Sequence, residues 1–551
     1  MILRFWLVAL MLVCTGSAIS RPLLVFNVNG YTLADDGTLQ RFAALLVDEG
    51  RIVATGDAAT LRERAPDARS HDGQGRTLLP GMIDAHGHVM GLGWSLQQVE
   101  LSSTPSLDAA LEAVRAYAAA HPEAVWITGR GWNQVIWKLG RFPTADELDH
   151  AVSDRPVWLA RVDGHAGWAN RAALALAGID AETPDPAGGR IERDSSGRAT
   201  GILIDAAMDL VQKKIPPADA TQSRAALDAA LAEMARVGIT SVHDAGIDAE
   251  TFTLFRAYAD AGKLSARLYA MIDGVGAEFD RIAVDGPVVG YGNDHLTVRS
   301  VKLYTDGALG SRGAALLAPY SDDPHNHGLL FHDRDTLTAM LGKALSRGYQ
   351  VNVHAIGDGG NRQVLDAFSL AYKAWGGREL RNRIEHAQVV TLEDIPRFLP
   401  LQLIASMQPT HATSDMNMAE DRVGPDRIHG AYAWQRFLGQ GTRIAAGSDF
   451  PVELANPFFG LHAAITRQDH ESRPEGGWYP AQRLSLEQAF RAFTVDAAHA
   501  AHQEDVLGTL TPGKWADFII VDRDIFAIPP EDVWRTGVVE TWVGGQKVFP
   551  H

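Results

Sequence analysis

The chain of 551 residues has almost no cysteine, and this scarcity excludes several kinds of chemistry. Its single cysteine is Cys14, close to the amino terminus. The residues after it can form no disulfide with one another and offer no thiolate to a metal or a substrate. No Gly-x-Ser-x-Gly motif follows a predicted strand, so acyl-enzyme catalysis by serine or cysteine is disfavoured.

Basic residues are scarce relative to acidic ones. The chain has 50 lysines and arginines and 67 aspartates and glutamates, which gives a formal net charge of −17. General nucleic-acid binding needs a basic surface, and so does attraction to an anionic membrane. We therefore expect no nucleic acid as partner, whereas the charge leaves both a small-molecule substrate and an oligomer possible.

Long apolar runs are confined to the amino terminus. Arg4 precedes a run from Phe5 to Val13 that is too short to span a bilayer, and small residues for cleavage follow it. This pattern predicts a signal peptide over residues 1–20 and an exported protein, periplasmic or extracellular. Lipoprotein anchoring at Cys14 is the less favoured alternative, because Val13 is a poor residue before such a cleavage. We expect no membrane-spanning segment after cleavage.

Both ends of the remaining chain contain short apolar strands separated by turn residues. Strands are predicted near 23–28, 43–48 and 51–56, and again near 517–521 and 538–548. Neither end is long enough to build a core of its own. We therefore expect one small β-sandwich domain formed by residues 21–78 together with residues 506–551.

Between the two ends, apolar runs alternate with helical patterns, as is typical of an α/β protein with a parallel sheet. Eight strands are predicted, at Met82–His86, Thr240–His243, Arg267–Ile272, Val298–Tyr304, Gln350–His354, Arg383–His386, Leu403–Met407 and Arg443–Ala446. Their number favours a (β/α)8 barrel of the TIM type over residues 79–505, with the active site at the carboxyl ends of the strands.

One connection of this barrel is too long for a simple loop and helix. We interpret residues of about 95–235 as an insertion after the first strand, and we expect it over the barrel mouth. The insertion is rich in tryptophan, including Trp132. These rings either contact a substrate or pack the core of the insertion itself.

Several predicted strands end in residues that can bind metal. His86 and His88 alternate at the end of the first strand, where alternate side chains point to the same face. Four further candidates stand at or just past the ends of other strands: Lys302, His354, His386 and Asp449. The carboxyl ends of barrel strands meet at one mouth, so these six side chains are expected to converge there. Because imidazole is the commonest protein ligand for zinc and similar metals, the pattern predicts a metal site.

The segments around these residues resemble the amidohydrolase superfamily, and most closely its YtcJ-like branch, amidohydrolase family 3. The resemblance covers nearly the whole chain after the predicted signal peptide. It rests on the His-x-His strand and on the segments VKLYTDGALGSR, NVHAIGDGGN, RIEHAQ, QPTHATSD, AAGSDFPVE and GTLTPGKWADFIIVDRD. The His-x-His pair alone is a weak signal, whereas the whole set is specific.

The resemblance implies one or two divalent metal ions, usually zinc. By that resemblance His86 and His88 bind the first ion and His354 and His386 bind the second. Asp449 would bind the first ion together with the nucleophilic water. Lys302 would bridge the two ions as a carbamate formed with carbon dioxide, because an ammonium group cannot ligate a cation.

The expected activity is hydrolysis of a non-peptide carbon–nitrogen bond, in an amide or a cyclic amide. A metal-activated hydroxide would attack the carbonyl carbon, and Asp449 would carry the proton to the leaving nitrogen. Two alternatives stay open: an ester or carbamate hydrolase that uses the same site, and a periplasmic binding protein without catalysis.

Further residues match motifs of the family outside the ligand set. Substrate binding, or orientation of a ligand, is predicted for Trp132, His165, Arg312 and His411. A structural role is equally open for His165 and His411, and Arg312 could instead pair with Asp306 within a loop. Glu385 and Asp358 neighbour predicted ligands and are expected to support the site from outside.

Overall fold

The computed structural model describes residues 21–34, 37–134, 136–161, 166–186 and 189–550. The predicted signal peptide over residues 1–20 and the candidate residue His165 lie outside these described residues. No helix within the described ranges is long and apolar enough to cross a membrane.

Eight parallel strands form the central sheet, and all eight coincide with predicted strands. Their order in space follows their order in the chain: β6 (Met82–Gly87), β13 (Ile239–Ile247), β14 (Arg267–Asp273), β16 (Leu296–Tyr304), β17 (Gln350–Ala355), β18 (Arg383–His386), β19 (Ile404–Met407) and β20 (Ile444–Ala446). Strands such as β6 are buried along their whole length, because one face lines the barrel interior and the other is covered by helices. This is why their sequences read as continuous apolar runs.

The first and last of these strands meet and nearly close the sheet into a barrel. The backbone N–H of Asp449 donates to the carbonyl oxygen of His86 at 2.7 Å, and that of His88 donates to Phe450 at 2.8 Å. Gly447 permits this approach, since a Cβ at its position would lie only 2.5 Å from the backbone nitrogen of His86. The arrangement is consistent with the predicted TIM-type barrel.

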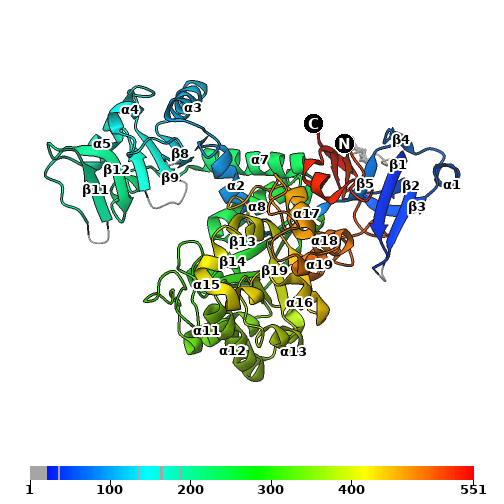
Figure 1. Ribbon diagram of the computed structural model, residues 1–551. Helices are drawn as coiled ribbons and strands as arrows, with labels where there is room; N and C mark the ends of the chain where they lie inside the picture. The colour runs from blue at the N-terminus through cyan, green and yellow to red at the C-terminus, as the bar shows by residue number, and fades with distance from the viewer. Residues whose placement is uncertain (1–20, 35–36, 135, 162–165, 187–188, 551) are drawn as a thin grey trace, which may run out of the picture.

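Helices surround the barrel (Figure 1). The longer of them are α7 (Ala220–Val237), α8 (Ala249–Asp260), α11 (Arg334–Leu345), α12 (Asp358–Trp375), α15 (Ala419–Arg427) and α17 (Pro457–Thr466). Asp248 begins α8 by accepting a hydrogen bond from the backbone N–H of Thr251, as is usual for an N-cap aspartate. In α12, buried residues such as Val364 and Phe368 recur at helical spacing and pack toward the sheet.

The long connection after β6 forms a sheet of its own. The helix α2 (Val89–Leu96) leads into six strands in the order β11 (Gly189–Arg193), β12 (Ala199–Asp205), β10 (Ala166–Ala169), β9 (Val157–Arg161), β8 (Ile127–Trp132) and β7 (Val99–Glu100). The helices of this region are α3 (Leu107–Ala120), α4 (Ala145–Asp149), α5 (Arg171–Ala177) and α6 (Asp209–Gln212).

This inserted sheet lies to one side of the barrel, beyond α2 and one end of α7 (Figure 1). Its position differs from the one predicted over the barrel mouth. Two apolar clusters bury side chains within the insertion itself, so it has a core of its own away from the mouth. The helix α7 falls within the range predicted to be inserted, but it packs against α2 and β13 and therefore covers the barrel.

Strands from both termini join one mixed sheet at the other end of α7 (Figure 1). Its order is β23 (Gln546–Phe549), β22 (Val538–Val543), β21 (Phe518–Val521), β5 (Thr77–Pro80), β1 (Leu23–Leu33), β2 (Leu39–Asp48) and β3 (Arg51–Gly56), and β4 (Arg69–Asp72) also pairs with β1. The predicted assembly from both termini is observed, whereas the β-sandwich is not confirmed. The reason is that β5 pairs with β1 on one side and with β21 on the other, which continues one sheet.

Candidate metal centre

The predicted ligands stand where the barrel strands end. His86 lies near the end of β6, Lys302 near the end of β16, His354 next to the last residue of β17 and His386 at the end of β18. Asp449 follows β20 by three residues. Because these strands are parallel neighbours, their carboxyl ends share one mouth and their side chains can converge there.

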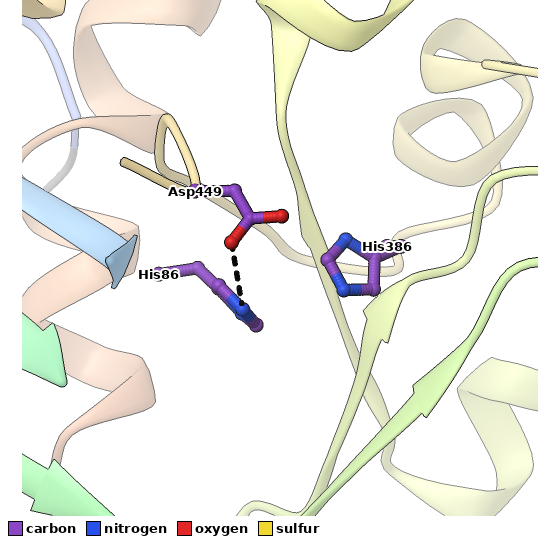
Figure 2. Close-up of side chains that lie close together, drawn as sticks. All are labelled: His86, His386 and Asp449. Atoms are coloured by element: carbon purple, nitrogen blue, oxygen red, sulfur yellow. Dashed lines mark ion pairs between the residues drawn. The ribbon is translucent and has the colours of Figure 1, made fainter. Parts of the chain in front are cut away.

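Three of the predicted ligands form a compact group (Figure 2). The ligand atoms of His86, His386 and Asp449 all lie within 4.8 Å of one another. Nε2 of His86 is 3.6 Å from Oδ1 of Asp449, and the ring centroids of His86 and His386 are 4.8 Å apart. All three residues are buried. Two imidazoles and a carboxylate at this spacing are a donor set suited to zinc or a similar divalent ion.

The other two predicted histidine ligands lie directly beside this group. Nε2 of His88 is 3.2 Å from Oδ1 of Asp449. The ring centroid of His354 is 4.6 Å from that of His386. The side chain of His88 is 32% exposed and that of His354 is 14% exposed, so His88 is the more accessible from solvent.

Lys302 lies against the same group. Its Nζ is 3.1 Å from Nε2 of His86, and its side chain is buried. Burial lowers the pKa of Lys302 from 10.5 to about 8, because a charged ammonium is disfavoured away from water. The environment of Lys302 therefore favours the neutral amine more than water does.

Several atoms that could bind a metal make no hydrogen bond, although each lies near an oppositely charged group. Among the described residues, Nε2 of His354, Nε2 of His411 and Oδ1 of Asp449 are buried and accept or donate no hydrogen bond. A buried polar atom without a partner costs free energy, so such atoms are rare unless they serve a function. Their clustering with His86 and His386 fits a site that holds a divalent cation.

The backbone at two of these ligands is strained. His386 and Asp449 have φ angles of 73° and 62°, in the left-handed region that residues with a side chain seldom adopt. Such conformations persist where the surrounding structure holds them and often occur at functional sites. Here they turn both side chains toward His86 (Figure 2).

Hydrogen bonds behind the histidines set which nitrogen faces the centre. Glu385 contacts Nδ1 of His86, and Oε1 of Gln408 lies 2.8 Å from Nδ1 of His386. A partner at Nδ1 takes the ring proton there and leaves Nε2 free to bind a metal. Burial alone would raise the pKa of Glu385, but Arg383 and His86 hold it well below its usual value. Glu385 is therefore ionised and supports the site as expected, whereas Gln408 was not among the predicted residues.

A second residue that the sequence did not reveal connects the two strands that close the barrel. Oδ2 of Asp84 accepts a hydrogen bond from Oγ of Ser448 at 2.6 Å, and its Oδ1 accepts the backbone N–H of His86 at 3.1 Å. Asp84 is buried, and burial raises its pKa to about 7. Its position two residues before His86 in an apolar run is the only signal that could have pointed to it.

The charge of Asp449 is favoured by its neighbours. Burial would raise the pKa of this carboxyl, but the imidazoles of His86, His88 and His386 hold it well below its usual value. The carboxylate therefore stays ionised. Nε2 of His411 is 3.7 Å from Oδ2 of Asp449, so this predicted outer residue does lie at the site.

The remaining predicted residues lie elsewhere. Arg312 pairs with Asp322, with nitrogen–oxygen distances of 2.9 and 3.1 Å, so the alternative pairing with Asp306 is wrong. The carboxylate of Asp306 instead accepts hydrogen bonds from backbone N–H groups on the loops after β16 and β17.

Trp132 is fully buried in the insertion, and its Nε1 donates to the carbonyl oxygen of Leu159 at 2.8 Å. Its surroundings are those of a core residue. Asp358 accepts the backbone N–H of Leu317 and holds a loop.

Comparison with known proteins agrees with this arrangement. The model of the amidohydrolase family matches residues 70–549. The chain belongs to the amidohydrolase family. Residues 43–68 also match a bacterial imidazolonepropionase-like composite domain.

Relatives of this amidohydrolase match it along nearly its whole length. The YtcJ protein of Bacillus subtilis (strain 168) is 33% identical over 528 residues, covering 94% of this chain and 98% of that protein. The N-substituted formamide deformylase of Arthrobacter pascens is 28% identical over 548 residues, covering 95% and 98%. The crystal structure of a metal-dependent hydrolase from Pyrococcus horikoshii OT3 superposes with a TM-score of 0.77 at 27% identity, covering 92% of this chain and 99% of that one. The predicted resemblance is confirmed.

Proposed function

We propose that this amidohydrolase hydrolyses a non-peptide carbon–nitrogen bond in a small amide or cyclic amide. The observation that carries the proposal is the buried group of His86, His386 and Asp449 with Lys302 against it. The relative from Arthrobacter pascens is named as a deformylase of N-substituted formamides, which supports a carbon–nitrogen bond as the target.

The residues at the mouth would hold one or two divalent ions, zinc being our first choice. His86, His88 and Asp449 would hold one ion, and His354 and His386 the other. We propose Lys302, as a carbamate, for the position between them, since its Nζ already lies beside a ligand nitrogen. When bound, such ions lower the pKa of a water molecule and polarise a carbonyl group.

Asp449 would move the proton of the reaction. Its carboxylate is ionised and therefore able to accept a proton from the attacking water. The water oxygen adds to the carbonyl carbon, the carbon–nitrogen bond breaks, and the proton passes from a carboxylate oxygen of Asp449 to the leaving nitrogen. His411, 3.7 Å from Oδ2, would orient this carboxylate.

The test compares the purified protein with its Asp449→Asn variant. Bound metal is measured per chain, and both proteins are offered formamides, N-acyl amino acids, cyclic amides and matching esters. We expect the wild type to hydrolyse at least one amide and the variant to lose about 10²–10⁴-fold in rate, the usual contribution of a positioned acid–base group.

Asp280→Asn is the matched control, because Asp280 is an exposed aspartate that pairs with Lys343 and Arg347 on the barrel surface. Its rate should stay near that of the wild type. Equal rates for Asp449→Asn and the wild type would refute the role of Asp449. Hydrolysis of esters alone would favour the ester alternative, and ligand binding without turnover would favour a binding protein.

A further inference from the structure

One wall of the barrel mouth carries polar groups that the proposed reaction does not use. Asp273 is the last residue of β14 and pairs in register with Lys302 on the neighbouring parallel strand β16. Residues paired in this way place their side chains on the same face of a sheet. Lys302 points into the barrel, where its Nζ reaches His86, so Asp273 faces the same mouth.

Tyr304 belongs to the same wall. It follows Lys302 by two residues on β16 and therefore shares its face. Its ring centroid is 5.1 Å from Nζ of Lys302 and 5.8 Å from the ring of His354. The aromatic ring of Tyr304 therefore lies beside two of the candidate metal ligands.

Gly246 on β13 leaves a space between these two residues. A Cβ at Gly246 would lie 3.6 Å from the hydroxyl oxygen of Tyr304 and 3.8 Å from Oδ1 of Asp273. Both oxygen atoms therefore border the same space, which the missing side chain keeps open. The φ of Gly246 is 129°, a conformation that disfavours any larger residue.

The carboxylate of Asp273 and the hydroxyl of Tyr304 form no hydrogen bond and no ion pair with any of the described residues. Other mouth carboxylates differ: Asp449 lies beside histidines, and Asp84 accepts hydrogen bonds from three donor groups. Lys302 and His88 favour the charged form of Asp273 through space and Asp248 opposes it, but none of the three is within ion-pair distance of its carboxylate. Asp273 is exposed and forms no ion pair within the described part of the chain, so its carboxylate is accessible to a cationic group of a ligand.

We propose that Asp273 and Tyr304 form a substrate subsite for a protonated amine. The carboxylate supplies the counter-charge and the tyrosine hydroxyl a second acceptor, while the amide carbonyl of the same substrate lies at the candidate metal centre. The proposal rests on the proposed amide hydrolysis and narrows its substrate class to amides that carry an ammonium group away from the scissile bond.

Three amides of equal length test the subsite. N-(4-aminobutyl)acetamide carries an ammonium group, N-pentylacetamide replaces it with a methyl group, and 5-acetamidopentanoate carries a carboxylate; the corresponding formamides extend the set. For the wild type, we expect kcat/KM to be highest for the cationic amide. For Asp273→Asn, we expect KM for the cationic amide to rise about tenfold, the scale of one lost charge-assisted hydrogen bond, with kcat and the neutral amide unchanged.

Two further variants sharpen the comparison. Tyr304→Phe removes only the hydroxyl and should raise KM for the cationic amide by a smaller factor. Glu250→Gln is the matched control, because Glu250 is an exposed carboxylate in the first turn of α8, just after β13. It removes the same charge nearby and should leave all three amides unaffected.

The outcomes separate the subsite from the proposed function. If Asp273→Asn lowers kcat for all amides alike, Asp273 acts on the metal centre and the subsite is refuted. If the wild type shows no preference for the cationic amide, the subsite is also refuted. If no amide is hydrolysed, the proposed function fails, and calorimetric titration of N-(4-aminobutyl)acetamide then decides the subsite alone. Binding that Asp273→Asn weakens supports it; binding that is absent, or equal in both proteins, overturns it.

Discussion

Glu385→Gln tests whether a buried carboxylate holds the metal ligand His86 in place. Oε1 of Glu385 is 2.7 Å from Nε of Arg383, both side chains are 0% exposed, and the other carboxylate oxygen contacts Nδ1 of His86. Glutamine keeps the shape and removes the charge. The guanidinium of Arg383 then stays buried without a counter-charge, which costs about 3–5 kcal/mol of unfolding free energy. Loss of the carboxylate behind the imidazole should also weaken metal binding ~10–100-fold.

Urea denaturation of the metal-free protein measures the first effect, and competition with a chromophoric chelator measures the second. Glu504→Gln is the control, because Glu504 pairs with Arg381 while both side chains are about a third exposed. Removing a partly exposed pair should cost less than removing the buried one and should leave metal affinity unchanged. If Glu385→Gln loses no more stability than Glu504→Gln and binds metal equally well, the assigned role of Glu385 is refuted.

Three other predictions address the lysine, the terminal sheet and the pH dependence. Lys302→Ala should lower both bound metal and activity, with partial rescue by a short carboxylic acid; unchanged metal content and rate would contradict the proposed bridge. Asp517→Asn leaves the buried guanidinium of Arg267 on β14 without its carboxylate, which lies 2.6 Å away, and should cost about 3–5 kcal/mol in urea denaturation; a loss below that of Glu504→Gln would argue against this anchor. Burial lowers the pKa of His502 from 6.5 to about 4. As the pH falls below 6.5, this histidine therefore takes up a proton in the unfolded chain before it does so in the folded one. Stability is lost between pH 6.5 and pH 4. His502→Asn, at a φ of 58° that asparagine tolerates, should reduce this loss in thermal unfolding at pH 4.5 relative to pH 7, and an identical pH profile would refute the assignment.

The sequence predicts the barrel well because the relevant signals are local. Each strand is a continuous apolar run bounded by turns, and the polar residue that ends it is read directly from the chain. His354 and His386 are examples: each follows a buried run, and the parallel topology alone places both at one mouth. No knowledge of side-chain packing is needed to bring them together.

Residues whose role depends on distant partners were not predictable in this way. Arg312 pairs with Asp322, which Arg422 from the segment after β19 also contacts. The partners come from loops whose conformation depends on packing and not on periodicity. Trp132 is a similar case, because whether it meets substrate or core depends on where the inserted sheet lies. That sheet satisfies its own apolar surface, so composition alone did not reveal its position beside the barrel.

The contacts that close the barrel also bring together residues of the candidate metal centre. Asp449 reaches His86 because Gly447 admits close backbone contact and because Asp84 holds Ser448 across the seam between β6 and β20. The same seam places a carboxylate and an imidazole 3.6 Å apart, although they are 363 residues distant in the chain. Buried atoms that make no hydrogen bond there, such as Oδ1 of Asp449, cost free energy when no cation is bound. A cation that binds them recovers that cost only when the seam is formed, so metal binding and barrel closure must stabilise each other.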